Sequence, residues 1–276
     1  MTRTALVLGA GGITGVAWQL GILIGLRRGG VDLGGVDRIV GTSAGAVTGT
    51  LIATGVEPER AVVIEEHVET PFHPDWARGA QAFALLSDAT LELPAIRAGV
   101  GALAVSADVG DEEPYVASLA QRLPVHDWPP PGRLLITGVD TTSGEPVVWD
   151  RAELAPLVRA VAASCAVPCV LPPVSVNGRR YMDGGIRSYT NADLVADADA
   201  VVVLAPRSPV RLRRSAVEEA AVLRDTGRVT LVKPDPASLG AGGQNVFDVT
   251  RWQPMVQAGI AQGAALAPAI AARLRD

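Results

Sequence analysis

Aromatic residues are scarce in this sequence, and their scarcity constrains the core. Phe, Trp and Tyr make up 4% of the 276 residues, whereas hydrophobic residues make up 48% and glycine occurs 30 times. A core with few large rings must be built from Ala, Val, Leu and Ile around backbones that approach closely. Helices packed on a parallel sheet meet this requirement. The length fits one α/β domain, so we expect a single domain over residues 1–276.

Cysteine is equally scarce, which argues against two kinds of structure. The two cysteines, Cys165 and Cys169, have no histidine or second cysteine pair nearby. A structural zinc site takes about four such ligands, and disulfide-stapled domains are rich in cysteine. We therefore expect buried, inert thiols, no metal and no cofactor, in a protein of a reducing compartment, the cytoplasm.

Lysine occurs once, at Lys233, and the basic residues form no dense block. The formal net charge is −5, and the longest basic cluster is Arg211, Arg213 and Arg214. Binding nucleic acid requires a basic surface, so nucleic acid is not expected as a partner. We interpret the arginine cluster as a solvated helix face, with a transient contact to an anionic membrane surface as the alternative.

A long uninterrupted apolar run is also missing near the start of the chain. Residues 5–26 are mostly apolar, but glycines at positions 9, 11, 12 and 15 interrupt them. This pattern predicts a strand over Thr4–Leu8, a glycine-rich turn and a buried helix that Gly29 and Gly30 end near Arg28. Residues 254–274 also contain glycine and proline, and we expect them to form a helix packed against the body of the protein.

Strand and helix patterns alternate along the rest of the chain, with one interruption. A strand over 36–40, a turn over 41–45 and a helix over 46–54 repeat the opening unit, as in a doubly wound sheet. Further strands are predicted over 134–139, 146–149, 174–176, 179–182, 201–204 and 229–232, and further helices over 154–163 and 211–224. Asn177-Gly178 predicts a two-residue hairpin. Residues 57–128 show helical patches but no clear strand, and we expect a helical lid or insertion there.

The turn over residues 41–45 reads GTSAG, which has the form G-x-S-x-G between a predicted strand and a predicted helix. A nucleophile on such a sharp turn needs small residues two positions before and two positions after it. The alternative is an ordinary strand-to-helix turn in which Ser43 caps the helix. The position between an apolar strand and an apolar helix favours the nucleophile.

Histidines do not occur where the common triad of this turn would need them. That triad runs in the order serine, acid, histidine, whereas His67, His73 and His126 all precede the second half of the chain. The acid would then come from the predicted lid, where candidates such as Asp75, Asp88 and Asp108 do not follow a sheet strand. The ordinary triad is disfavoured, and each histidine is expected to be structural or on the surface.

An acid that acts directly on the serine is the simpler arrangement, and Asp183 is the best placed. It ends a predicted strand, and the glycines Gly184 and Gly185 follow it. They would let the backbone turn closely so that the carboxylate faces the nucleophile. The alternative is that Asp-Gly-Gly is only a turn. Together with the serine turn, the catalytic interpretation is favoured.

The first glycine-rich turn, residues 9–15, reads GAGGITG and offers unobstructed backbone N–H groups at a helix N-terminus. An acyl-transfer enzyme needs such donors for the oxyanion. The rival is a dinucleotide-binding turn of the form G-x-G-x-x-G, followed by an acidic residue about 20 positions on. Thr14 stands in place of its third glycine, and neither Asp32 nor Asp37 ends a convincing second strand, so the rival is weaker.

These motifs resemble those of the patatin-like phospholipases. The 9–15 turn resembles their oxyanion turn, the 41–45 turn resembles their nucleophile turn, and Asp183-Gly184-Gly185 resembles their Asp-Gly-Gly element. Residues 163–168, continuing through 171–173, are similar to the segment before the catalytic aspartate in bacterial members, and Asn191 has a counterpart there. The resemblance implies a three-layer α/β/α fold with a mostly parallel sheet, a Ser-Asp dyad, and hydrolysis of acyl esters in phospholipids or other lipids without a metal.

Position by position, the resemblance makes Ser43 the nucleophile, Asp183 the base, and the amides of Gly11 and Gly12 the oxyanion donors. The amide of Ala44 is a further donor candidate from the general geometry of this turn. The supporting turns contain Gly9, Gly15, Gly41, Gly45, Gly184 and Gly185.

The sequence departs from the family pattern at two positions. Thr14 stands where many members carry Arg or Lys, which removes a fixed positive charge near the oxyanion turn. Cys169 stands where glycine is usual, which we expect to narrow the space near Asp183. The partner expected is a lipid or another acyl ester. Two alternatives stay open: an acyltransferase with the same dyad, and a catalytically silent lipid-binding or regulatory protein, against which the intact Ser43 and Asp183 count.

Overall fold

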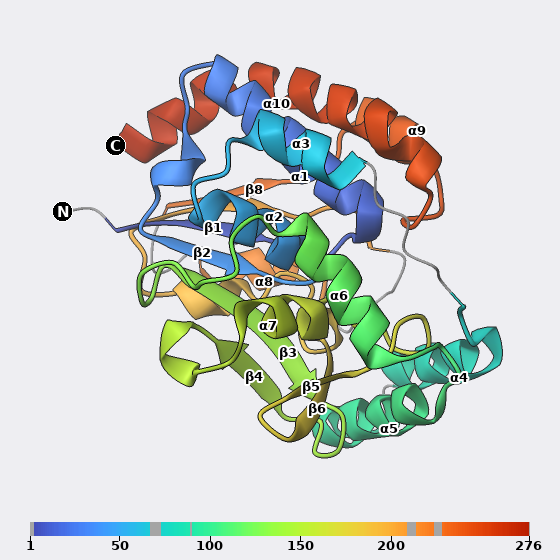
Figure 1. Ribbon diagram of the computed structural model, residues 1–276. Coiled ribbons are helices and arrows are strands. Elements are labelled where there is room, and N and C mark those ends of the chain that lie inside the picture. The colour runs from blue at the N-terminus through green and yellow to red at the C-terminus, as the bar shows by residue number, and fades with distance from the viewer. Residues whose placement is uncertain (1–2, 67–72, 89, 209–213, 224–227, 276) are drawn as a thin grey trace.

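The computed structural model describes residues 3–66, 73–88, 90–208, 214–223 and 228–275 (Figure 1). Its strands are β1 Thr4–Leu8, β2 Arg38–Gly41, β3 Leu134–Asp140, β4 Pro146–Trp149, β5 Val174–Val176, β6 Arg179–Asp183, β7 Ala200–Leu204 and β8 Arg228–Val232. Its helices are α1 Gly12–Arg28, α2 Ala44–Ala53, α3 Pro58–Glu66, α4 Trp76–Ser87, α5 Leu93–Ser106, α6 Glu112–Arg122, α7 Leu157–Ser164, α8 Ala216–Ala221, α9 Pro236–Gly242 and α10 Trp252–Arg275.

The strands form one mixed sheet in the order β5-β6-β3-β2-β1-β7-β8, with β4 also paired to β3. The run from β3 through β2, β1 and β7 to β8 is parallel, whereas β4, β5 and β6 pair antiparallel. Parallel pairing was predicted for most of the sheet and holds for this run. The antiparallel part arises because β4 returns from β3 through a short connection and β5 turns into β6 at Asn177-Gly178, where both residues have positive φ as the hairpin requires.

Helices cover both faces of the sheet, which gives the three-layer α/β/α fold. Alternate residues of β1 point to opposite faces: Leu6 and Leu8 join the larger core cluster, and Ala5 and Val7 join a second cluster on the other side. The larger cluster packs against α1, α2, α7 and α10 (Figure 1). The second face is covered more thinly, by α8 and the short 3-10 turn Ala192–Val195.

The C-terminal helix α10 lies along α1 (Figure 1). Gly21 and Gly25 of α1 meet Gly259 and Gly263 of α10, and a Cβ at either α1 position would collide with the backbone of the partner helix. By length and hydropathy, Val249–Leu274 could cross a membrane. In the structure this helix packs against the body of the protein, as the glycines predicted.

Residues 57–128 contain four helices, α3 to α6, and no strand among those that the structure describes, as predicted. Helices α4 and α5 pack on each other and against β3 and β6, where they form a small cluster of their own with Val139 and Met182. The prediction that this segment acts as a lid stays a prediction.

Most predicted strands agree with the structure within one residue, but several boundaries were wrong. The helices predicted over 46–54 and 254–274 begin two residues earlier, at Ala44 and Trp252. The strand predicted over 36–40 begins at Arg38. The helix predicted over 154–163 begins only at Leu157, because Leu154 is left-handed at φ 53° and a proline follows at position 156. Of the helix predicted over 211–224, residues 216–221 are helical, starting from a capping box at Ser215. Residues 211–213 and 224 lie outside the described part of the chain.

Candidate active site

Ser43 lies on a tight turn between β2 and α2, with φ 53° and ψ −117°. Positive φ is uncommon for a residue other than glycine. Its side chain makes no capping bond to α2, which disfavours the simple N-cap interpretation. A Cβ at Gly45 would collide with the carbonyl of Leu8, so only glycine lets α2 pass this close to the end of β1. The turn therefore presents the serine hydroxyl away from the helix.

Asp183 ends β6 and is 5% exposed, as is Ser43. Burial raises the pKa of its carboxyl to about 6, although hydrogen bonds from the Ser43 side chain and the Gly185 backbone oppose the shift. The Gly185 N–H donates to Oδ1 at 2.7 Å. The structure thus brings together the two residues that the sequence predicted as a pair, and it gives the acid a proton affinity suited to accepting a proton near neutral pH.

Strand β3 explains why these two residues meet. It pairs with β4 along residues 136–139, so β2 and β6 share its other edge. Gly41 at the end of β2 lies opposite Ile136, and Asp183 at the end of β6 lies opposite Gly138, two residues further on. Because β2 runs parallel and β6 antiparallel to β3, their C-terminal ends point toward each other. The serine turn and the aspartate turn meet in this gap.

The turn predicted to hold an oxyanion borders the same site. Gly11 and Gly12 line the cavities at Ser43, as does Ala44. Within the described part of the chain, no backbone hydrogen bond outside the regular elements uses the amides of these three residues as donors. Gly12 has φ 61°, and a Cβ there would lie 2.8 Å from the carbonyl oxygen of Val246. The amide of Ser43 itself is already taken, because it donates to Ser164 Oγ at 3.0 Å.

Asn191 is fully buried and connects the two turns of the site. Its side-chain nitrogen donates to Thr42 Oγ1 at 3.0 Å and to Thr137 Oγ1 at 3.2 Å. The two threonine hydroxyls are 3.0 Å apart, and the Asn191 amide also reaches the carbonyl of Gly184. This network holds the nucleophile turn, β3 and the aspartate turn together, so Asn191 is a positioning residue.

The two departures from the family pattern have different structural consequences. Cys169 has φ 62°, a left-handed conformation that favours glycine, and it lines a cavity together with Asp183. Burial raises the pKa of its thiol to about 11, which fits the prediction of an inert cysteine. Thr14 lines neither cavity at Ser43, and its backbone N–H donates to Val246. Position 14 is therefore occupied by an uncharged residue that is buried in the first turn of α1.

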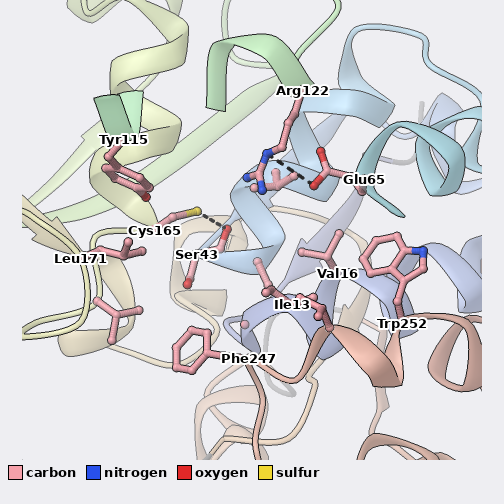
Figure 2. A pocket seen from close by; sticks show the side chains of 15 residues that line it. Ile13, Val16, Ser43, Glu65, Tyr115, Arg122, Cys165, Leu171, Phe247 and Trp252 are labelled. Carbon is pink, nitrogen blue, oxygen red and sulfur yellow. Dashed lines mark hydrogen bonds and ion pairs between the residues drawn. The ribbon is translucent and has the colours of Figure 1, made fainter. Parts of the chain in front are cut away.

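Two cavities meet at Ser43. The larger, about 420 Å³, lies between α4 and the aspartate turn, and its wall includes Trp76, Phe83 and Asp183. The smaller, about 80 Å³, also borders Ser43 (Figure 2). Side chains from several elements line it, namely Ile13, Val16, Val47, Glu65, Tyr115, Arg122, Cys165, Leu171, Phe247 and Trp252. A serine that borders two cavities can hold an ester with its two halves in different surroundings.

The predicted role of histidine agrees with the structure as far as it is described. His73 and His126 are exposed and line neither cavity, and His67 lies outside the described residues. Among the residues described, no group of three or more His, Cys, Asp or Glu side chains could hold a metal ion.

Sequence reasoning missed the charged side chains of the smaller cavity. Glu65 near the end of α3 and Arg122 at the end of α6 face each other there, with Nε and Oε2 3.8 Å apart (Figure 2). It also missed Trp252, and it included Ser164 in the segment that resembles the family without giving it a role. No local pattern marks Glu65, Arg122 and Trp252, because each takes its position from helices that pack together only in the folded protein.

The sequence model of the patatin-like phospholipases matches residues 6–196, which include both turns and the aspartate. The chain belongs to the patatin-like phospholipase family. It is 31% identical over 203 residues to the uncharacterized NTE family proteins Mb1092c of Mycobacterium bovis and Rv1063c of Mycobacterium tuberculosis. The match covers 74% of this chain, and the chain spans about half the length of these relatives, 48%.

Among solved structures, VipD from Legionella pneumophila aligns over 97% of this chain and 67% of its own, with 13% identity and a TM-score of 0.47. The type III effector ExoU aligns over 98% of this chain and 53% of its own, with 17% identity and a TM-score of 0.48.

Proposed function

We propose that the protein is a lipid acyl hydrolase in which Ser43 and Asp183 form a catalytic dyad. The observation that carries the proposal is that a serine on a positive-φ turn lines the same cavity as a buried carboxyl whose pKa is raised to about 6. Membership of the patatin-like phospholipase family supports the substrate class. The largely apolar walls of the adjoining cavities support an acyl chain as the group bound.

In the proposed reaction, Asp183 accepts the hydroxyl proton as Ser43 Oγ attacks the ester carbonyl. The tetrahedral intermediate collapses, the alcohol leaves with a proton from Asp183, and the acyl group remains on Ser43. Asp183 then takes a proton from water, which attacks the acyl-serine, and it returns this proton to Ser43 Oγ as the acyl bond breaks and the fatty acid is released. Burial assists because it raises the proton affinity of the carboxylate.

The amides of Gly11 and Gly12, with Ala44 as an additional candidate, would donate to the oxyanion. Their lack of backbone partners outside the regular elements supports this role. Each such donor contributes about 2.7–4 kcal/mol to lowering the barrier in hydrolases. The geometry of the 9–15 turn is therefore as important for the rate as the base.

The proposal is tested with chromogenic acyl esters and a fluorescent fluorophosphonate. We expect ester cleavage and probe labelling in the wild-type protein, and loss of both in Ser43→Ala. Asp183→Asn should lose cleavage while retaining the fold, checked by circular dichroism. Cleavage that survives Ser43→Ala would sink the proposal. A product formed with an added alcohol acceptor would favour the acyltransferase, and an unlabelled serine in a folded protein would favour a silent lipid-binding protein.

A further inference from the structure

The charged pair in the smaller cavity is unusual because it is buried without being hydrogen-bonded. The side chains of Glu65 and Arg122 are 4% and 16% exposed, and their closest atoms, 3.8 Å apart, are too far for a hydrogen bond. Glu65 Oε1 and Arg122 Nε are buried and have no hydrogen-bond partner within the described part of the chain. The nearby Trp252, which lines the same cavity, also has a buried indole N–H without a partner.

Such an arrangement opposes folding unless something completes it. Removing two ions from water costs free energy. Their mutual attraction offsets this cost only when they lie close together and further hydrogen bonds satisfy the remaining atoms. Nearly all buried polar atoms in proteins have a partner. Glu65 and Arg122 instead line a space that also borders Ser43, and Oε1 of the one and Nε of the other have no partner among the described residues (Figure 2). Charged side chains with unused hydrogen-bonding atoms beside a cavity are typical of a binding site.

The pair selects among possible ligand groups by charge and by hydrogen bonding. An anion could bind Arg122 but would be repelled by Glu65, and a cation has the opposite difficulty. A hydroxyl group is neutral and can donate to the Glu65 carboxylate while accepting from the Arg122 guanidinium. The volume of about 80 Å³ leaves room for roughly three water-sized groups. A short hydroxylated fragment fits this description better than a large head group.

We propose that the smaller cavity binds the alcohol part of a glycerol monoester, with a free hydroxyl held between Glu65 and Arg122 and the acyl chain in the larger cavity. The reaction at Ser43 belongs to the proposed function, on which this assignment of the ester rests. The binding preference itself requires no turnover. Glu65 and Arg122 are then specificity residues for the leaving alcohol.

The first test measures binding without catalysis. Two ethers that cannot be hydrolysed, 1-O-hexylglycerol and hexyl propyl ether, are titrated into the protein by calorimetry. We expect the glycerol ether to bind at least about tenfold more tightly, since a site built to hydrogen-bond a hydroxyl rejects the analogue that lacks it. In Glu65→Leu/Arg122→Met the ratio should fall to about one. Replacing both charges with apolar groups of similar size is commonly tolerated, and thermal unfolding checks the fold.

The control is a second charged pair that involves the same helix. Arg27 of α1 and Glu59 of α3 form an exposed ion pair at 3.5 Å, away from both cavities at Ser43. Arg27→Met/Glu59→Leu should leave the binding ratio unchanged. The same variants are then assayed for kcat/KM on glycerol monohexanoate and propyl hexanoate. Only Glu65→Leu/Arg122→Met should lose the preference for the glycerol ester, measured as the ratio of the two kcat/KM values.

The outcomes separate this inference from the proposed function. A protein that prefers the glycerol ether but hydrolyses neither ester supports the binding site and contradicts the hydrolase. Equal affinity for the two ethers, or no binding of either, overturns the inference even if both esters are cleaved. Tighter binding of 1-O-hexylglycerol 3-phosphate than of the neutral ether also overturns it, in favour of an anion site at Arg122.

Discussion

The two cavities that meet at Ser43 differ in their walls and in their size. The larger one is lined mainly by apolar groups, and at its rim α4 exposes Trp76 by 72% and Phe83 by 46%. The smaller one contains a buried ion pair whose atoms lack hydrogen-bond partners in the described structure. Ser43 therefore borders a large apolar cavity and a small one whose mostly apolar wall contains a charged pair. We therefore expect the two halves of a substrate to be recognised by different kinds of interaction.

The largest effect is expected from disturbing Gly12, which both cavities share. Gly12→Ala places a methyl group against the Val246 carbonyl on a residue with positive φ. The backbone must shift to relieve this contact. The displacement should move the proposed oxyanion amides and lower kcat/KM by about 10²–10³ for every ester. Gly240→Ala is the control, because no atom lies within 4 Å of that position. An activity within threefold of wild type would contradict the role of Gly12.

A substitution that fills only the larger cavity should separate the contributions of the two cavities to ester binding. Gly79 of α4 lines that cavity, and a Cβ there would meet only Cys169, at an ordinary contact of 3.9 Å. Gly79→Leu should reduce kcat/KM for long-chain esters by about tenfold to hundredfold and leave acetate esters nearly unchanged. Ala84→Leu, on the exposed part of the same helix, should change neither. Equal losses for long and short chains would mean that the acyl group lies elsewhere.

The pH dependence should be the same for both sides of the site, because Asp183 is the one base proposed for every substrate. A carboxyl can accept a proton only when ionised, and burial raises the pKa of Asp183 to about 6. As the pH falls through this value the carboxylate is protonated, so kcat/KM should be about tenfold lower at pH 5 than at pH 7. Esters that differ in chain length or alcohol should share this acid limb. An acid limb of kcat/KM with its midpoint near pH 4 would show that the group controlling the rate is not Asp183.

The smallest effect is expected at the exposed rim of the larger cavity. If α4 meets a lipid surface, Trp76→Ser should lower hydrolysis of lipids in vesicles by roughly threefold to tenfold, since partial burial of a large apolar side chain contributes about 1 kcal/mol or more. Hydrolysis of dissolved short esters should not change. Leu154→Ser, at a residue 85% exposed that lines neither cavity, serves as the control. Equal loss on dissolved esters would assign Trp76 to the cavity alone.

Features encoded by adjacent residues could be predicted from the sequence. Glycines at turns and helix ends mark where backbones approach, so the strand-turn-helix units and the hairpin at Asn177-Gly178 were predicted correctly. The pairing of Ser43 with Asp183 was predicted from the missing histidine and from the family resemblance. The reason for their contact, the two strands that meet along β3, was not, because strand direction depends on long-range pairing.

The smaller cavity shows the limit of sequence reasoning most clearly. Glu65 and Arg122 come from two helices in a segment with no motif, and their burial depends on how those helices pack. Cys169 was recognised as a departure from a glycine. Its left-handed backbone could not be predicted, since conformation at a single non-glycine residue is decided by its surroundings.

The segment of residues 164–166 has a consequence for how such a site can evolve. Ser164 accepts from the amide of Ser43, the Cys165 thiol donates to the Ser43 carbonyl, and the Ala166 carbonyl accepts from the amide of Asp183. One short peptide thus touches both reacting residues. A mutation there displaces nucleophile and base at once, so its effect on fitness should depend on the residues already present in both turns. We expect strong epistasis among these three places, with compensating changes inherited together.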